Sequence, residues 1–279
     1  MIRWRKDASI GSVGRKHVGY LRRTRRVNFL GDSMSRKRPV FLRADWNHLL
    51  FANYKVHPDL LESLVPRGTI LDTWKGMTFL SLVAFRFNKT RILGSSVLRW
   101  RNFEEVNLRF YVKNGEGTHG KKGVVFIKEF VPSNLIAIVA RVLYGENYEK
   151  TTLSSEVKSS PPASRSVTYE IKHSEPVNTF SGVYSAMGVP PGANSLESFI
   201  TEHYWGFSSK NECMTVEYEV EHPRWPVSEM DNYVINIDYG KLYGKSYEVL
   251  SSVKPHSVFY CEGSEVLVRF GTKLYHPQL

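Results

Sequence analysis

The stretch FEEVNLRFYV at Phe103–Val112 predicts the fold class more clearly than any other segment of the chain. Successive side chains of a β-strand point to opposite faces of a sheet. One face of this stretch is apolar and consists of Val106, Leu108, Phe110 and Val112. The opposite face is polar and consists of Glu105, Asn107, Arg109 and Tyr111. The alternation therefore predicts a strand with at least one buried face.

The polar face of this strand has two interpretations. The pattern alone favours an outer face in contact with water, as in many antiparallel sheets. The alternative is a polar lining of a cavity inside a barrel. Glu105 and Arg109 are four residues apart, which is on the order of 13 Å along a strand. We therefore expect each of them to need a partner from another element, or a ligand between them.

Strand patterns also dominate the sequence on both sides of this stretch. They cover Asn47–Val56, Thr69–Trp74, Met77–Phe87, Gly123–Phe130, residues 167–171, Met214–His222, and a closing hairpin of Ser252–Tyr260 and Glu265–Phe270 that turns at Glu262-Gly263. The polar segment Ser154–Ser164 is predicted to be the tip of a long hairpin, or else a domain boundary. Alternation in the region of Met214 predicts that Glu217, Glu219 and Glu221 face water.

Three short helices are predicted between the strands. One follows Pro58, one covers Ser133–Tyr144 on an apolar i, i+3, i+4 pattern, and one follows a capping box at Asn194–Glu197. Roughly ten strands with few helices and little βαβ alternation predict an α+β, mostly-β fold. We expect a mostly antiparallel sheet, closed or strongly curved, with the helices to one side. Closing the sheet would remove its exposed edges.

Composition limits the class of protein. The chain has 279 residues, of which 42% are hydrophobic and 23% are charged, as in ordinary globular proteins. No apolar run approaches the roughly 20 residues that span a bilayer, and the start has no secretory signal pattern. The two cysteines, Cys213 and Cys261, are too few for a disulfide framework and are expected to be buried. We expect a cytoplasmic location and no membrane contact.

Residues 1–35 form a basic arm before a domain predicted at 36–279. The first 33 residues hold nine Lys and Arg residues and two acids, while the net charge of the whole chain is +11. The arm has no periodic pattern and is predicted to be disordered. It could bind nucleic-acid phosphates through Arg22–Arg26, it could be a transit peptide, or translation could begin at Met34. We favour the last, and expect no nucleic-acid binding outside the arm.

Several motifs resemble, in the same order, those of the YqjF-like family of unknown function. They are WNHLLFANY at Trp46–Tyr54, LVP at Leu64–Pro66, FEEVNLRFYV at Phe103–Val112, GVVFIKEF at Gly123–Phe130, ARVLYGENY at Ala140–Tyr148, TEHYWGF at Thr201–Phe207 and HPRWP at His222–Pro226. The resemblance extends over roughly Arg38–Lys273. Because this family is similar to acetoacetate decarboxylases, the resemblance implies a cone-shaped, closed antiparallel β-barrel with an internal cavity.

The resemblance also implies site residues. Glu105 matches a cavity glutamate of the decarboxylases, and Arg141 and Gly145 match the stretch that carries their Schiff-base lysine. Tyr148 stands where that lysine would be, and Lys150 lies two positions further along. An imine needs a primary amine, so Schiff-base decarboxylation is disfavoured. A tyrosine in this place can donate a hydrogen bond or act as an acid or base.

We predict a polar cavity that binds or transforms a small oxo- or carboxylate-containing metabolite. The catalytic candidates are Glu105 and Tyr148, and the substrate-binding candidates are Asn107, Arg109, Tyr111 and Arg141. Either of the two arginines could grip a carboxylate bidentately. The alternative is a non-enzymatic module that binds a ligand or a partner, in which Arg109 neutralises charges across the barrel and Tyr148 is a core aromatic residue.

The sequence leaves open whether the protein is an enzyme and whether it forms a homo-oligomer. If it is an enzyme, we expect lyase- or hydrolase-like acid–base chemistry. The nine histidines show no metal-ligand spacing, and no Walker-type or dinucleotide fingerprint is present, so we expect neither a metal nor a cofactor. His48 is interpreted as a core residue. His203 leaves a Ser-His-Asp arrangement open, although no Gly-x-Ser-x-Gly elbow occurs.

Overall fold

The fold is known from a computed structural model of the chain, which describes residues 37–95, 101–115, 120–133, 145–160, 164–173 and 175–276. The predicted basic arm, nearly all of the predicted helix Ser133–Tyr144, and the candidate Arg141 lie outside the described residues. The chain divides after Lys37 into two units, and every element described below belongs to the second.

The second unit is built mostly of strands, with a few short helices. The strands are β1 (Val40–Val56), β2 (Ile70–Leu71), β3 (Thr78–Ile92), β4 (Phe103–Asn114), β5 (Lys121–Val131), β6 (Tyr148–Lys150), β7 (Thr152–Ser160), β8 (Ser164–Lys172), β9 (Asn178–Tyr184), β10 (Trp205–Asn211), β11 (Met214–Glu221), β12 (Ser228–Glu229), β13 (Asn232–Asn236), β14 (Ser257–Arg269) and β15 (Thr272–Tyr275). The helices are α1 (Asp59–Glu62), α3 (Leu196–Thr201), α4 (Tyr239–Tyr243) and the 3-10 helix η3 (Lys245–Ser251). The prediction of a mostly-β α+β fold is confirmed.

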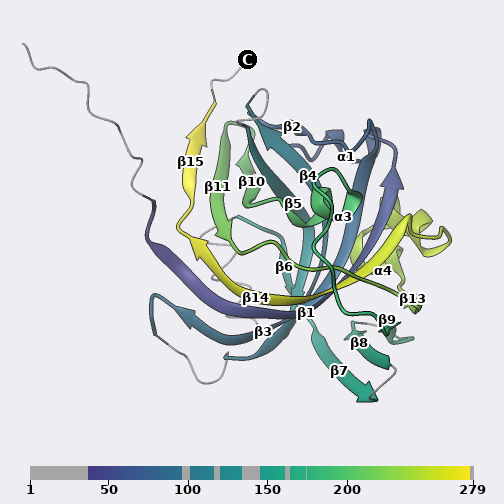
Figure 1. The fold of residues 1–279 in the computed structure, drawn as a ribbon. Helices are drawn as coiled ribbons and strands as arrows, with labels where there is room; N and C mark the ends of the chain where they lie inside the picture. The colour runs from purple at the N-terminus through teal and green to yellow at the C-terminus, as the bar shows by residue number, and fades with distance from the viewer. Residues whose placement is uncertain are drawn as a thin grey trace, which may run out of the picture. The chain divides into compact units, whose positions relative to one another are not determined.

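The larger sheet has eleven strands, and its pairings run in a ring. The order is β14-β1-β3-β4-β5-β10-β11, and β11 pairs again with β14 through Val220–Val268 and Glu221–Leu267 (Figure 1). All pairings in this sheet are antiparallel except those of β5 with β10 and with β6. The expectation of a mostly antiparallel sheet is therefore confirmed, with β5 as the strand that departs from it.

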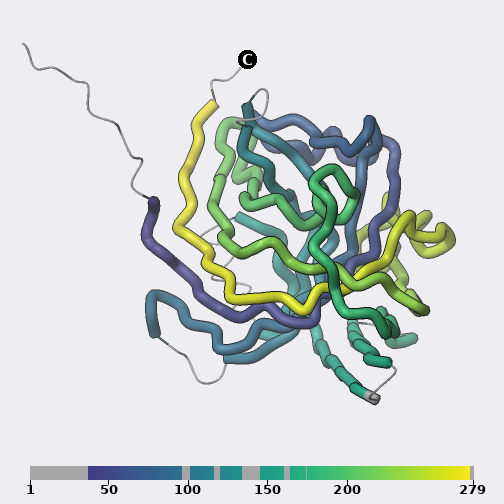
Figure 2. Tube along the Cα trace, in the orientation of Figure 1, coloured from purple at the N-terminus to yellow at the C-terminus, as the bar shows by residue number. Residues whose placement is uncertain are grey.

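The predicted hairpin at Glu262-Gly263 is wrong. β14 continues through these residues and lies beside β1 along nearly its whole length, as the tube in Figure 2 shows. Gly263 adopts φ +95° opposite Asn47, and a Cβ atom on it would come within 1.8 Å of the Trp46 carbonyl oxygen. Glycine is needed here because the two backbones approach closely within a paired strand, not because the chain turns.

The smaller sheet has four antiparallel strands in the order β13-β9-β8-β7. Most of the segment that was predicted to be a hairpin tip, Ser154–Ser160, belongs to β7 and pairs with β8 residue by residue. Many side chains of β7 are exposed or only partly buried, so the strand has a polar composition. For this reason the sequence pattern did not predict it as a strand. The hairpin itself is confirmed, and its strands are longer than predicted.

The larger sheet is buried on both faces, by two separate hydrophobic clusters. The outer cluster joins one face of β1, β3 and β4 to the smaller sheet, α4 and η3. The inner cluster consists of the opposite faces of these strands together with α3. The expectation that the helices lie to one side is thus wrong, because α3 packs inside the ring. Its N-cap is Ser195, whose hydroxyl accepts from the Ser198 amide, one residue later than predicted. None of the described helices is long and apolar enough to cross a membrane.

Candidate functional site

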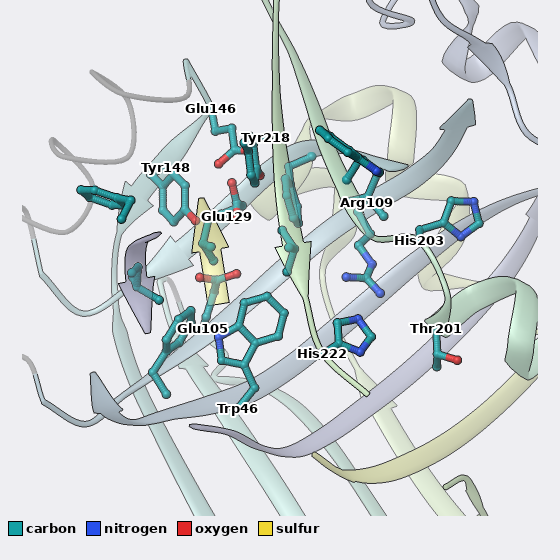
Figure 3. Close-up of a pocket in the computed structure, with 18 of the residues that line it drawn as sticks. Trp46, Glu105, Arg109, Glu129, Glu146, Tyr148, Thr201, His203, Tyr218 and His222 are labelled. Atoms are coloured by element: carbon teal, nitrogen blue, oxygen red, sulfur yellow. The ribbon is translucent and has the colours of Figure 1, made fainter. Parts of the chain in front are cut away.

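The inner face of the larger sheet surrounds a pocket of about 120 Å³, here called the ring pocket (Figure 3). Its wall is largely aromatic, and these residues are Phe41, Trp46, Phe87, Phe103, Phe126, Trp205 and Trp225. Its polar lining comes from separate elements and consists of Glu105, Arg109, Glu129, Glu146, Tyr148, Thr201, His203, Tyr218 and His222. The ring pocket therefore combines an apolar wall with a small number of ionisable groups, as ligand sites commonly do.

β4 supplies the first part of this lining. The side chains of Glu105 and Arg109 line the ring pocket, and the strand alternation places Asn107 and Tyr111 on the same inner face. Glu105 is 3% exposed and Asn107 1% exposed. The interpretation of this face as solvated is wrong, because the sheet curves into a ring and brings the face inside. The cavity-lining alternative agrees with the structure.

A β-bulge in β5 supplies the second carboxyl group. Leu108 pairs with Lys128 and Arg109 pairs with Phe126, so Ile127 is an extra residue on β5. A bulge reverses the alternation of side chains beyond it. Without it, Lys128 would follow Phe126 into the ring pocket. With it, Lys128 instead forms an ion pair with Glu149 and donates to the Leu242 carbonyl, and Glu129 lines the ring pocket.

The segment before and within β6 supplies the third carboxyl group and a tyrosine. Parallel pairing sets Tyr148 beside Glu129, and Glu146 is buried two residues earlier. The Tyr218 hydroxyl of β11 donates to Glu146 Oε1. The Tyr148 hydroxyl is within hydrogen-bonding reach of both Glu105 and Glu129. Four elements thus converge at one end of the ring pocket.

Glu105, Glu129 and Glu146, here called the carboxyl cluster, all have a raised pKa. Burial raises the pKa of Glu105 to about 7, although the Asn107 amide, which donates to its Oε1 at 3.0 Å, acts in the opposite direction. Burial likewise raises the pKa of Glu146 to about 7, and hydrogen bonds from Tyr218 and Glu129 oppose it. Burial and the charges of the other two carboxylates raise the pKa of Glu129 well above its ordinary value. Low polarity and mutual repulsion both disfavour ionisation.

The proximity of the three carboxyl groups also favours a shared proton. Glu129 is within hydrogen-bonding reach of both Glu105 and Glu146. Two carboxyl groups can hydrogen-bond to each other only if one of them is protonated. Glu129 Oε1 is buried and has no ordinary hydrogen-bond donor among the described residues. The cluster can therefore hold at least one shared proton and titrate as a unit near neutral pH.

Arg109 lies at the other end of the ring pocket, apart from the carboxyl cluster (Figure 3). No carboxylate of the described residues forms an ion pair with it, and its Nε is buried without a hydrogen-bond partner among them. Its guanidinium lies 5.5 Å from the Phe51 ring centroid and 6.0 Å from the Tyr111 ring centroid. The Tyr111 hydroxyl in turn lies 2.7 Å from Ser81 Oγ. Arg109 is thus a cation held by neutral neighbours, which suits it to bind an anion.

Two histidines line the ring pocket on the Arg109 side (Figure 3). His222 stacks on Trp225 with ring centroids 3.9 Å apart, and its Nδ1 lies 2.8 Å from the Pro223 carbonyl oxygen. His203 Nε2 lies 3.2 Å from Asp72 Oδ2. Burial lowers the pKa of both rings, that of His222 to about 4. Both histidines are therefore neutral at pH 7 and can accept hydrogen bonds from a ligand.

The structure brings most of the predicted site residues together. Glu105, Arg109 and Tyr148 line the ring pocket, while Asn107 and Tyr111 support Glu105 and Arg109 from behind. Arg141 lies outside the described residues. The sequence analysis missed the residues Glu129, Glu146, Tyr218, His222 and the pair Asp72–His203. The alternation of side chains along β11 puts Tyr218 on the face opposite Glu217 and Glu219, but no residue pattern points to it as part of a site, and nothing in the sequence marks the bulge that turns Glu129 inward.

One strand of the ring departs from its predicted exposure. Glu217 was expected to face water, yet it is buried and forms an ion pair with Lys121. Glu219 and Glu221 are partly exposed and both pair with Arg269 of β14. These three glutamates therefore connect β11 to neighbouring strands and do not line the ring pocket. In the described part of the chain, no group of three or more His, Cys, Asp and Glu residues is arranged to hold a metal ion.

Comparison with known proteins places this geometry in context. The DUF2071 family, described as uncharacterized conserved proteins, matches residues 43–265. The uncharacterized protein YqjF of Bacillus subtilis is 27% identical over 188 residues, which are 66% of this chain and 74% of that protein.

Solved structures of similar fold include acetoacetate decarboxylase of Legionella pneumophila, with a TM-score of 0.58, 12% identity, and coverage of 85% of this chain and 89% of that one. The enduracididine biosynthesis enzyme MppR complexed with pyruvate gives a TM-score of 0.60, 11% identity, and coverage of 87% and 93%. At this identity the likeness establishes the fold alone.

Proposed function

Because the family match covers most of its length, the chain belongs to the DUF2071 family of uncharacterized conserved proteins, and we propose that its ring pocket binds or transforms a small oxo- or carboxylate-containing metabolite without a Schiff-base lysine. The observation that carries this proposal is the separation of charge in the ring pocket. A cation without a carboxylate partner among the described residues, Arg109, lies at one end, and the proton-sharing carboxyl cluster lies at the other.

The size and shape of the site support a small ligand. A cavity of about 150 Å³ accommodates a molecule the size of benzene, and the ring pocket has about 120 Å³. The ring of strand pairings that returns through β11 and β14 supports a closed barrel around it. The fold neighbours include an acetoacetate decarboxylase and the enduracididine biosynthesis enzyme MppR, and MppR has been solved with pyruvate, a small oxo acid.

The lysines support the absence of imine chemistry. Every lysine after Lys16 lies in the described part of the chain, and none of them lines the ring pocket. Tyr148 is in the ring pocket instead, and burial together with the three nearby carboxylates raises its pKa well above the ordinary value. Tyr148 therefore stays protonated and acts as a hydrogen-bond donor.

In the proposed mode of action, Arg109 binds the carboxylate of the metabolite through charge-assisted hydrogen bonds. The oxo group faces the carboxyl cluster, where a protonated carboxyl group or Tyr148 donates a hydrogen bond to it. As an enzyme, the protein would use Glu105 as the acid that completes this proton transfer. The aromatic wall excludes water and so strengthens both interactions.

A thermal-shift screen of the full-length chain against oxo acids, aldehydes and simple carboxylates tests the proposal. We expect an oxo acid to raise the Tm of the wild type, and to raise that of Glu105→Gln much less. Glu62→Gln, a change at an exposed glutamate of α1, is the matched control and should respond like the wild type. If no oxo acid or carboxylate stabilises the wild type, the proposal fails and a partner-binding role on this scaffold takes its place.

A further inference from the structure

The indole N–H group of Trp46 is a hydrogen-bond donor that takes no part in the proposed mode of action. Its side chain lines the ring pocket, and its Nε1 atom is buried without a hydrogen-bond partner among the described residues. A buried tryptophan N–H usually has a partner, because a buried donor without one costs free energy. The donor is therefore available to a molecule in the ring pocket.

A β-bulge in β1 places Trp46 on the inner face of the sheet. Two residues of β1, His48 and Leu49, lie opposite the single residue Phe85 of β3, and His48 adopts φ +57°. A bulge reverses the alternation of side chains beyond it. Trp46 before the bulge and Leu49 and Phe51 beyond it consequently pack in the same inner cluster.

Aromatic neighbours hold the Trp46 ring in one orientation. Its centroid lies 4.9 Å from that of Phe85, 5.5 Å from that of Phe87 and 6.4 Å from that of Trp225. Figure 3 shows Trp46 beside Glu105, with the indole nitrogen on the edge of the ring nearest to Glu105. The unused donor thus lies at the carboxyl-cluster end of the ring pocket, away from the cationic end.

Two other tryptophans use their indole N–H group within the chain. Trp225 Nε1 donates to Ser264 Oγ at 2.8 Å, and Trp74 Nε1 donates to the Asn194 carbonyl oxygen at 3.1 Å. Trp225 also lines the ring pocket, so it presents an aromatic surface there without a free donor. Trp46 presents both an aromatic surface and a donor.

The chemistry of this end of the ring pocket selects the group that Trp46 can bind. An indole N–H only donates, so its partner must be an acceptor. A carboxylate of the ligand would be repelled by any ionised member of the carboxyl cluster. A carbonyl oxygen is a neutral acceptor with two lone pairs, and so it can accept from two donors at once. Tyr148, which stays protonated, and the shared proton of the carboxyl cluster are candidates for the second donor.

We propose that Trp46 Nε1–H donates a hydrogen bond to the oxo oxygen of the bound acid, and that Tyr148 or a protonated carboxyl group of the cluster supplies a second. This inference rests on the proposed function and names the residue by which the ring pocket selects an oxo acid over the same acid without its oxo group. Two donors fixed on one carbonyl oxygen also stabilise negative charge that develops there.

Two pairs of acids that differ only in the oxo group test the inference. They are pyruvate with propanoate and 4-oxopentanoate with pentanoate, and calorimetric titration of the full-length protein gives each Kd. We expect the wild type to bind at least one oxo acid more tightly than its partner. Trp46→Phe keeps an aromatic ring but lacks the N–H, and it should lose about 2- to 10-fold of this preference. The smaller ring affects both acids of a pair, so the ratio of their Kd values isolates the N–H.

Two matched variants serve as controls. Trp225→Phe makes the same change in the wall of the ring pocket, but the N–H that it removes is bonded to Ser264. It should therefore keep the preference for the oxo acid, even where its affinity for both acids changes. Trp74→Phe removes an indole that does not line the ring pocket and should bind all four acids like the wild type.

The indole N–H signals of the protein labelled with ¹⁵N report the hydrogen bond directly. The Trp46 signal is the one that is missing from the spectrum of Trp46→Phe. The oxo acid should move the Trp46 proton signal downfield, and its partner acid should move it much less. A purely structural role of Trp46 would not produce a shift that depends on the oxo group.

The outcomes separate this inference from the proposed function. If Trp46→Phe keeps the full preference of the wild type, Trp46 is not the donor, and the proposed function stands. If the wild type binds both acids of each pair equally, or binds neither oxo acid while another acid of the thermal-shift screen binds, the inference fails alone. If no acid of that screen binds, the proposed function fails and this inference fails with it.

Discussion

The two faces of β4 are equally buried but chemically different. On the outer face, Val106, Leu108 and Phe110 are 0% exposed and pack in the cluster that joins the larger sheet to the smaller sheet. On the inner face, Glu105 and Asn107 are 3% and 1% exposed and belong to the surroundings of the ring pocket. A regular polar–apolar alternation usually separates water from core. Here it separates a face that packs against the smaller sheet from a face that carries polar groups of the ring pocket.

The largest effect should come from the outer face. Phe110→Ala removes a fully buried ring from the outer cluster, and we expect it to lower the free energy of unfolding by about 3–5 kcal/mol because of lost burial and the cavity that remains. Urea denaturation followed by tryptophan fluorescence measures the change. A loss below about 1 kcal/mol would show that the two sheets do not pack as described.

The inner face should instead control ligand binding. Arg109→Gln removes the cation that faces the ring pocket, and we expect affinity for a bound carboxylate to fall by about 10- to 100-fold, since a hydrogen bond to a charged group contributes about 1.5–3 kcal/mol. The free energy of unfolding should change much less than in Phe110→Ala. Calorimetric titration with the acid identified by the thermal-shift screen measures the affinity.

Arg43→Gln is the control for this comparison. The Arg43 guanidinium pairs with Glu265 at 3.0 Å, and the two side chains are 49% and 53% exposed. An exposed ion pair of this kind contributes little to stability, and the ring pocket does not include it. Arg43→Gln should therefore bind the acid like the wild type. Equal losses in Arg43→Gln and Arg109→Gln would indicate a nonspecific effect of charge.

The carboxyl cluster should make stability depend on pH in a defined direction. The pKa of Glu105 is raised from 4.5 to about 7 in the folded protein, so the folded state keeps a proton that the unfolded state has lost between these values. The free energy of unfolding therefore falls as pH rises from about 4.5 to about 7. Glu105→Gln removes this contribution, and relative to the wild type it should gain about 1–3 kcal/mol between pH 4 and pH 8.

Urea denaturation of both proteins across this range checks the sign. Glu62→Gln, which changes an exposed carboxyl group, should run parallel to the wild type at every pH. A Glu105→Gln variant that instead loses stability relative to the wild type as pH rises would mean that Glu105 is ionised and stabilised in the folded protein. The shared proton of the carboxyl cluster would then be absent.

The strands could be predicted from sequence because their pattern is local. β4 was predicted almost to the residue, and β3 and β5 within a few residues, since alternation and turn residues lie within each segment. The turn predicted at Gly263 failed because a glycine needed for close backbone approach looks the same in sequence as one needed for a turn. Only the pairing of β14 with β1 distinguishes the two cases.

The site was only partly predictable because its residues depend on long-range geometry. Glu105 and Arg109 were identified on one strand, but their burial follows from the closing of the ring of pairings. Glu129 enters the ring pocket only because of the bulge at Ile127, and local sequence does not specify which residue bulges. Asp72 and His203 are 131 positions apart, so no spacing pattern could join them.

The most direct test of the account is a crystal structure of the protein with the oxo acid that stabilises it most in the thermal-shift screen. We expect the molecule inside the ring pocket, with its carboxylate on the Arg109 guanidinium and its oxo oxygen facing Glu105 and Tyr148. An acid bound outside the ring of strands, or one whose carboxylate lies among Glu105, Glu129 and Glu146, would contradict the assignment of the two ends of the ring pocket.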